Sequence, residues 1–240
     1  MDDNLEHYCV CMFEDPEAPE VRKLPPEEQA LLTTPKAAVL KSTMWPEDYL
    51  ITCRFLGGSA ALQGRVKSAA KQWESIANLT FDFRNAGPTA IRIAFLPGKG
   101  SWSYIGTVCK TIPEPRPTMN YGWLTDASSD AVVRQVVLHE FGHAVGLIHE
   151  HQNPLGGIKW NRDAVIADLS GPPNNWNLDK IETNMFKHYD PTALVASAVD
   201  KKSIMMYPIP RAWTLDGFST GLNSSISAID KLVVSKAYRP

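Results

Sequence analysis

The chain has 240 residues, of which 44% are hydrophobic and 21% charged, and its formal net charge is −2. This composition is typical of a soluble globular protein that is large enough to bury a core. The balanced charge argues against nucleic acid or an anionic membrane as a partner, because either would need a basic surface. No run of 18 apolar residues occurs, so we expect no membrane span.

Residues 1–43 differ in composition from the rest of the chain. Acidic residues dominate as far as Glu28, and prolines recur between Pro16 and Pro35, which disfavours regular structure. We therefore expect an N-terminal extension or pro-segment here. The segment lacks the basic start and apolar core of a secretion signal, so the protein is cytoplasmic, is exported by a non-classical route, or has already lost its signal.

The chain from Trp45 onward alternates strand and helix patterns. Tyr49–Phe55 is predicted to be a strand, and Ser59 is a plausible cap for a helix whose apolar residues run from Leu62 to Ile76. Residues 79–83 alternate apolar and polar side chains, which predicts a second strand. Strand, helix and strand in this order predict a parallel pair joined by a right-handed crossover.

The middle of the chain contains shorter strand candidates and one long helix. Ile91–Phe95 is predicted to be a third strand, and Trp102–Gly106 and Met119–Trp123 are shorter candidates. Ser128–Asp130 is a good helix start, with the acid near the positive end of the dipole. The residues that follow it are apolar on nearly every side, so we expect this helix to be buried.

The C-terminal third contains many Pro and Asn residues and only weak strand signals, so we expect an irregular lobe. It is predicted to end in a helix. Ser227–Asp230 resembles a capping box with Asp in the place of Glu, and Ile229 to Ala237 follow with helical spacing. The chain contains no internal repeat, and its four cysteines are too few and too scattered for a disulfide framework, so we expect free thiols.

The segment from His139 to His151 contains four histidines. His139 and His143 are four residues apart, so on a helix both imidazoles project from one face. His149 would point away from them on a straight helix. Gly146 allows the helix to end, because glycine accepts the left-handed backbone that turns a chain away from a helix. We therefore expect His139, His143 and His149 to converge on one ion.

Three neutral imidazoles with an open fourth position are typical of a catalytic zinc ion, here one Zn2+. Zinc lowers the pKa of its bound water, and Glu140 is placed to act as the general base and acid. His151 does not fit this spacing, so a surface or supporting position is expected. Nothing in the sequence suggests chemistry for His7 or His188.

The segment His139–Glu150 resembles the signature of the astacin family of metzincin zinc endopeptidases, in which a glutamate follows the third histidine. Ser203–Tyr207 resembles the Met-turn of that family. The resemblance implies that Met205 forms the apolar floor beneath the zinc. It also implies that Tyr207 is a switching metal ligand, which stabilises the tetrahedral intermediate.

The resemblance also implies an α+β, metzincin-like fold. Its N-terminal lobe, about residues 44–149, contains a twisted mixed sheet and two helices. Its C-terminal lobe, about residues 150–240, is irregular and ends in a helix. Trp102–Gly106 is similar to the segment that follows the substrate-lining edge strand of the family. The family's disulfides are not implied, because Ser101 stands where one of its cysteines would be.

Members of this family are kept inactive by a pro-segment group that blocks the zinc, so we looked for such a group here. Phe13–Asp15 matches the aspartate motif of family pro-segments poorly, and Cys9 or Cys11 is an alternative zinc-blocking group. Residues 37–40 resemble the mature start of some members. Cleavage after Lys36 is therefore a hypothesis, and the new ammonium would then pair with Glu150 as it does in the family.

The sequence predicts a zinc metalloendopeptidase that acts on proteins or peptides, with a monomer as the expected state. Two alternatives remain open: a non-catalytic zinc-bearing interaction domain and a matrixin-like protease. Glu140 argues against the first, while Glu150 and Tyr207 argue against the second. The sequence does not predict a substrate preference. The specificity pocket would be shaped by the irregular stretch between His151 and Ser203, where sequence patterns are least informative.

Overall fold

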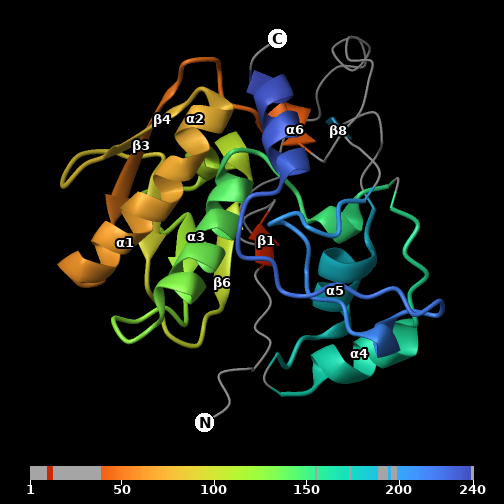
Figure 1. The fold of residues 1–240 in the computed structure, drawn as a ribbon. Helices are drawn as coiled ribbons and strands as arrows, with labels where there is room; N and C mark the ends of the chain where they lie inside the picture. The colour runs from red at the N-terminus through yellow and green to blue at the C-terminus, as the bar shows by residue number, and fades with distance from the viewer. Residues whose placement is uncertain are drawn as a thin grey trace.

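The computed structural model describes residues 10–12, 39–154, 156–172, 174–188, 194–195 and 199–238. These residues form two lobes, with helices α3 (Asp130–Ala144) and α6 (Ala228–Tyr238) between them (Figure 1). The sheet and helices α1 (Ala60–Ala70) and α2 (Glu74–Ala77) form the N-terminal lobe. Helices α4 (Arg162–Ser170) and α5 (Leu178–Ile181) form part of the C-terminal lobe. The predicted α+β fold class is therefore confirmed.

The main sheet is mixed and has the order β1-β6-β7-β5-β3-β4. Only the pair β6–β7 is antiparallel, and the other four pairs are parallel. The parallel pairing of β3 with β4 agrees with the predicted crossover. A separate two-stranded ladder pairs β2 with β8. The strands are β1 (Val10–Met12), β2 (Val39–Leu40), β3 (Leu50–Phe55), β4 (Thr80–Phe83), β5 (Ile91–Ala94), β6 (Ser101–Tyr104), β7 (Met119–Tyr121) and β8 (Leu194–Val195).

Short helical turns connect the longer elements. One of them, Glu182–Phe186, has the wide π geometry and directly extends α5. The others are 3-10 turns at Lys41–Thr43, Lys71–Trp73, Gly106–Thr111, Glu150–Gln152 and Arg211–Trp213.

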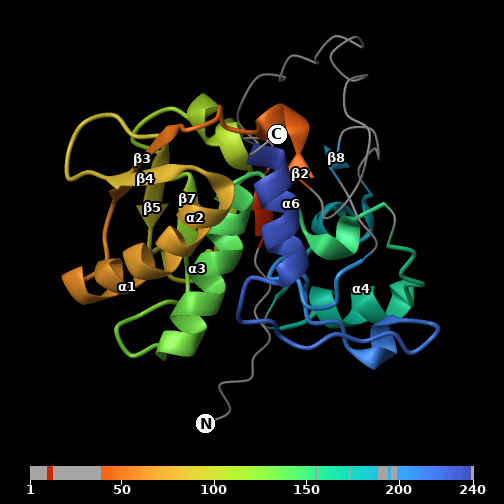
Figure 2. The same ribbon diagram turned by 45° about the horizontal axis from the view of Figure 1, so that its top comes forward.

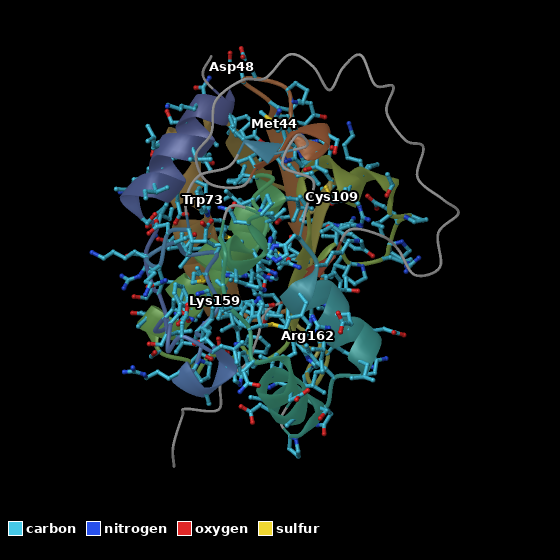
Figure 3. All side chains as sticks on the ribbon, turned by 90° about the vertical axis from the view of Figure 1, so that its right-hand side faces the viewer. Met44, Asp48, Trp73, Cys109, Lys159 and Arg162 are labelled. Atoms are coloured by element: carbon cyan, nitrogen blue, oxygen red, sulfur yellow. The ribbon has the colours of Figure 1, made fainter. Side chains whose placement is uncertain are left out.

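Helices α1 and α3 begin where the sequence predicts. Ser59 accepts a hydrogen bond from the Leu62 amide, and Ser129 accepts one from the Val132 amide, so each serine is an N-cap. Trp73 lies beside α3 (Figure 3) and donates from its indole Nε1 to the Leu138 carbonyl at 3.0 Å. This bond lets a large buried side chain pack against the helix without leaving a polar atom unpaired.

Two expectations about helices need correction. The first turn of α3 is exposed at Ala131 and Val132, and burial becomes continuous only from Val136. The C-terminal lobe is less irregular than predicted, because α4 and α5 lie within it. The caps of these two helices, Asn161 and Asn177, were present in the sequence, but the helices are only 9 and 4 residues long, which is too short for a clear helical period.

The closing helix α6 has the predicted capping box in its shorter, Asp-containing form. The Asp230 amide donates to Ser227 Oγ, and the Ser227 amide donates to Asp230 Oδ2, both at 2.9 Å. The Asp230 carboxylate also accepts from the Ser203 hydroxyl and the Ile204 amide. The cap of α6 therefore also anchors the turn at residues 203–207.

The folded unit extends to the N-terminal side of residue 44. Val39 is fully buried, and the Leu40 amide donates to the Gly146 carbonyl at 3.0 Å. Val39 pairs with Val195 and bridges to Leu147, so it adds a strand beside the end of α3 (Figure 2). The proposed cleavage point at Lys36 and the segment Phe13–Asp15 lie outside the described residues.

Helix α3 ends in a Schellman motif at Gly146. The Gly146 amide donates to the His143 carbonyl and the Leu147 amide donates to the Gly142 carbonyl, at 2.8 and 2.9 Å. Gly146 has φ +95°, which a residue with a side chain rarely adopts. The predicted stop is therefore confirmed, and the chain reverses before His149.

We expect Gly146→Ala to lower the free energy of unfolding by about 1–2 kcal/mol, because an added Cβ disfavours the left-handed backbone. Thermal unfolding measures this as a lower melting temperature. Gly64→Ala is the matched control: Gly64 lies inside α1 with open space around it, so the same change should stabilise by about 0.5–1 kcal/mol. Equal effects of the two substitutions would contradict this account of the helix end.

Candidate metal centre

The three predicted histidines meet where the two lobes join. His139 and His143 project from α3, and His149 returns to them after the reversal at Gly146. One ligand atom from each of the three lies within 4.8 Å of the others. The Nε2 atoms of His143 and His149 are 3.2 Å apart. Two nitrogens that bind one tetrahedral zinc ion lie about 3.3 Å apart, so this spacing suits a shared ion.

Backbone carbonyls orient two of the imidazoles. His139 Nδ1 donates to the Ile204 carbonyl, and His143 Nδ1 donates to the Leu147 carbonyl, each at 2.8 Å. Because a carbonyl oxygen only accepts, both neutral rings must carry their proton on Nδ1 and leave Nε2 with a free lone pair. His139 Nε2 is buried and has no hydrogen-bond partner among the described residues, as expected of an atom that awaits a metal.

Burial keeps these imidazoles in the neutral form that binds metals. It lowers the pKa of His139 to about 4. It also lowers the pKa values of His143 and His149 well below the ordinary value, and the neighbouring imidazoles lower them further. The donor set, the tautomers and the protonation states therefore all fit a Zn2+ ion.

The predicted Met-turn lies beneath this centre and is tied to both ends of the histidine motif. The Ile204 carbonyl holds His139, while the Met205 carbonyl accepts from the Glu150 amide at 3.0 Å. Met205 is buried, and its sulfur lies so close to Gly142 that a Cβ added there would overlap it. A glycine at position 142 is therefore what allows the turn to approach α3.

The two predicted catalytic side chains are both buried. Glu140 follows His139 on α3 and is 0% exposed. The Tyr207 ring lies against His149, with centroids 4.3 Å apart, and 6.3 Å from the centroid of His139. The Tyr207 ring therefore lines the metal centre, and Glu140 is buried on the helix that carries the first two ligands.

Glu150 lies in a buried polar network that the sequence did not reveal. Its Oε1 accepts from Asn153 Nδ2 at 3.2 Å and from the Asp200 amide at 3.0 Å. Burial raises the pKa of Glu150 to about 8. Asp200 in turn accepts from the Ser227 hydroxyl, which links the network to the cap of α6. No local pattern marks Asp200, because its partner is 50 residues away.

The remaining predicted residues fall into three groups. His151 is fully buried beside the centre rather than on the surface, whereas His188 is exposed. Cys53 and Cys109 are free and buried, and burial raises the pKa of both thiols. His7 and Cys9 lie outside the described residues.

The segment Trp102–Gly106 differs from its expected role. Residues 101–104 are themselves strand β6, rather than a segment that follows the edge strand. One edge of β6 pairs with β7, and the other pairs in parallel with β1, with Val10 opposite Trp102 and Met12 opposite Tyr104. The chain's own N-terminal strand therefore covers the outer edge of β6.

Comparisons with known proteins agree with this geometry. The structure resembles that of myroilysin with a TM-score of 0.83 and 43% sequence identity, over 85% of this chain and 99% of that one. It shares its fold with high choriolytic enzyme 1, a hatching enzyme zinc-protease from Oryzias latipes. That match has a TM-score of 0.54 and 14% identity, over 82% of this chain and 95% of the other.

Curated relatives match a shorter segment. The zinc metalloproteinase nas-36 of Caenorhabditis briggsae is 30% identical over 149 residues, which cover 58% of this chain and 22% of that protein. The Caenorhabditis elegans protein of the same name is 28% identical over the same shares. This chain thus spans about a fifth of the length of these relatives.

A family model settles the relationship. The model described as Astacin (Peptidase family M12A) matches residues 38–220, and these include all three histidines, Glu140 and the Met-turn. The match begins one residue before the buried Val39. The chain therefore belongs to the astacin family, peptidase family M12A.

Proposed function

We propose that this chain is an endopeptidase that hydrolyses peptide bonds within protein substrates, with Glu140 as the general base and acid. One observation carries the proposal above the others: three buried, neutral imidazoles offer ligand atoms that all lie within 4.8 Å of one another, and Glu140 follows the first of these histidines on α3. A purely structural zinc site would be closed by a fourth protein ligand of the same kind, such as Cys or His.

His139, His143 and His149 would hold the zinc ion through Nε2. When bound, zinc supplies a Lewis acid that polarises the scissile carbonyl and lowers the pKa of the attacking water. The carbonyls of Ile204 and Leu147 keep the rings in the required orientation, so little reorganisation is needed on binding.

Glu140 would take the proton from the attacking water and then deliver it to the departing amine. Its position next to His139 on α3 supports this role, because helix geometry keeps the carboxylate close to the first metal ligand. Its complete burial supports the role as well, since a low dielectric strengthens the electrostatic pull on the proton.

Tyr207 would be a metal ligand in the resting enzyme and would move to donate its hydroxyl to the oxyanion. The placement of its ring against His149 supports a position beside the reacting carbonyl. A hydrogen bond that forms only as negative charge develops lowers the barrier without tightening ground-state binding.

The substrate would be an extended protein segment that pairs with the outer edge of β6, because an unpaired strand edge offers backbone hydrogen bonds to a peptide. Strand β1 covers that edge here.

None of the helices in the described part of the chain has the length and apolar character that a membrane crossing needs.

We expect Glu140→Gln to lower kcat by about 10²–10⁴-fold while zinc remains bound, because the amide cannot accept the proton but the three imidazoles are unchanged. Peptide hydrolysis and metal analysis of the purified variant test this together. The control is Glu47→Gln, which makes the same change at an exposed site and should leave kcat unaltered. Full activity in the Glu140 variant would contradict the assignment, and a wild type that binds zinc without hydrolysing peptides would indicate the non-catalytic alternative.

Tyr207→Phe should lower kcat by about 10²-fold and change KM much less, because the lost hydroxyl contact is made mainly in the transition state. Steady-state kinetics on one peptide substrate separate the two constants. Tyr49→Phe removes a hydroxyl from a tyrosine that stacks on Trp45, and it serves as the control. An unchanged kcat for Tyr207→Phe would count against the switching role.

Cleavage after Lys36 should raise kcat/KM, because removing β1 uncovers the edge of β6 and the new ammonium gains the buried Glu150 carboxyl as a partner. N-terminal sequencing of the active species, alongside assays before and after cleavage, tests this. An active species that still begins at Met1 would end the hypothesis.

A further inference from the structure

His151 lies two residues beyond the third histidine and has no role in the mechanism above. It belongs to the 3-10 turn Glu150–Gln152, and its side chain is fully buried. Its Nε2 donates to the Asn184 carbonyl at 2.7 Å, so Nε2 carries a proton. A ring held at one end in this way has a defined plane.

The acceptor for His151 comes from an unusual piece of backbone. Within the π turn Glu182–Phe186, the Lys187 amide donates to the Glu182 carbonyl, five residues back. The Thr183 and Asn184 carbonyls receive side-chain donors from the metal-site turn: Gln152 Nε2 at 2.7 Å and His151 Nε2 at 2.7 Å. Widened turns of this kind often occur at functional sites.

The faces of the His151 ring contact the metal centre. Its centroid is 4.5 Å from that of Tyr207, with 32° between the planes, and 5.3 Å from that of His149, with 19° between the planes. The Tyr207 ring therefore packs against both His149 and His151, at 4.3 and 4.5 Å. The Trp160 ring lies perpendicular to that of His151, with centroids 6.0 Å apart.

Simple filling of the core does not account for a histidine here. His151 Nδ1 is buried and has no hydrogen-bond partner among the described residues, and such a group costs about 1–3 kcal/mol. A phenylalanine would occupy similar space without this cost. A locally unfavourable residue of this kind is expected where function requires it.

We propose that His151 is a positioning residue for Tyr207: anchored by the Asn184 carbonyl, its ring sets the plane and the range of motion of the Tyr207 phenol beside His149. This inference rests on the proposed function, because the alignment matters for catalysis only if Tyr207 acts there. The phenol must move between a metal-bound position and an oxyanion-bound position, and a rigid neighbour keeps that movement on one path.

Two variants separate the ring from its anchor. His151→Phe retains an aromatic ring but removes the bond to Asn184, while His151→Gln retains a donor near the Nε2 position but removes the ring. We expect each to lower kcat by about tenfold with KM within about twofold, since even small misplacement of a catalytic group is costly. For His151→Phe, we also expect a melting temperature close to that of the wild type, because removing the unpaired Nδ1 offsets the loss of the donor to the Asn184 carbonyl. A purely structural role would not combine an unchanged melting temperature with lower kcat.

A double-mutant cycle tests whether the effect acts through Tyr207. In a Tyr207→Phe background, either His151 substitution should lower kcat by less than about twofold, because the group being aligned is already gone. Gln152→Ala is the matched control, since it loosens the same π turn without removing a ring from Tyr207. Its effect should be the same in both backgrounds.

A measurement on the full chain without substrate gives an independent result. NMR of protein labelled at its seven tyrosines should show slow flipping of the Tyr207 ring in the wild type and faster flipping in both His151 variants. The Tyr207→Phe protein identifies the signal by its absence. This result does not depend on peptidase activity, so it stands apart from any failure of the proposed function.

Equal losses of kcat in the wild-type and Tyr207→Phe backgrounds would overturn the inference, as would unchanged flipping of the Tyr207 ring. An unaltered kcat in both His151 variants would also overturn it. Should His151→Gln fail to fold, His151→Phe carries the same cycle alone. If the wild type shows no peptide hydrolysis, or if Glu140→Gln does not reduce it, then the proposed function is wrong. The NMR result on Tyr207 is a separate test and does not change that conclusion.

Discussion

The reversal of the chain at Gly146 is the constraint on which the metal centre depends. A helix can present two imidazoles from one face, but a third residue only six positions further on points elsewhere unless the helix ends between them. The Schellman bonds to His143 and Gly142 make that end compact, and the left-handed backbone at φ +95° redirects the chain. Local geometry thus brings His149 back to the ion.

Hydrogen bonds made by the Met-turn connect the two lobes. Its backbone accepts from His139 of α3 and from Glu150 of the C-terminal lobe, and Asp230 of α6 holds Ser203 and Ile204 in turn. Each of these bonds is buried, so breaking one leaves an unpaired polar group in a low-dielectric interior. The ligand set is therefore supported from elements distant in sequence, which gives the preorganisation that metal binding and catalysis require.

Strand β1 brings the N-terminal segment against strand β6 of the main sheet. It pairs with β6 along the strand edge at which, under the proposed function, an extended substrate would bind. The buried Glu150 carboxyl accepts from Asn153 and from the Asp200 amide, and it lies beside the acidic side chain of Asp200.

The sequence alone determined the parts of this protein that depend on local geometry. The spacing of His139, His143 and Gly146, and the caps at Ser59, Ser129 and Ser227, follow from backbone hydrogen bonds within a few residues.

Tertiary structure decided everything that depends on distant partners. The carbonyl that orients His139 is 65 residues away, and the one that anchors His151 is 33 residues away. The burial of His151, the pairing of β1 with β6 and the network at Asp200 likewise have no periodic signature, because packing and long-range hydrogen bonds select them rather than local propensity.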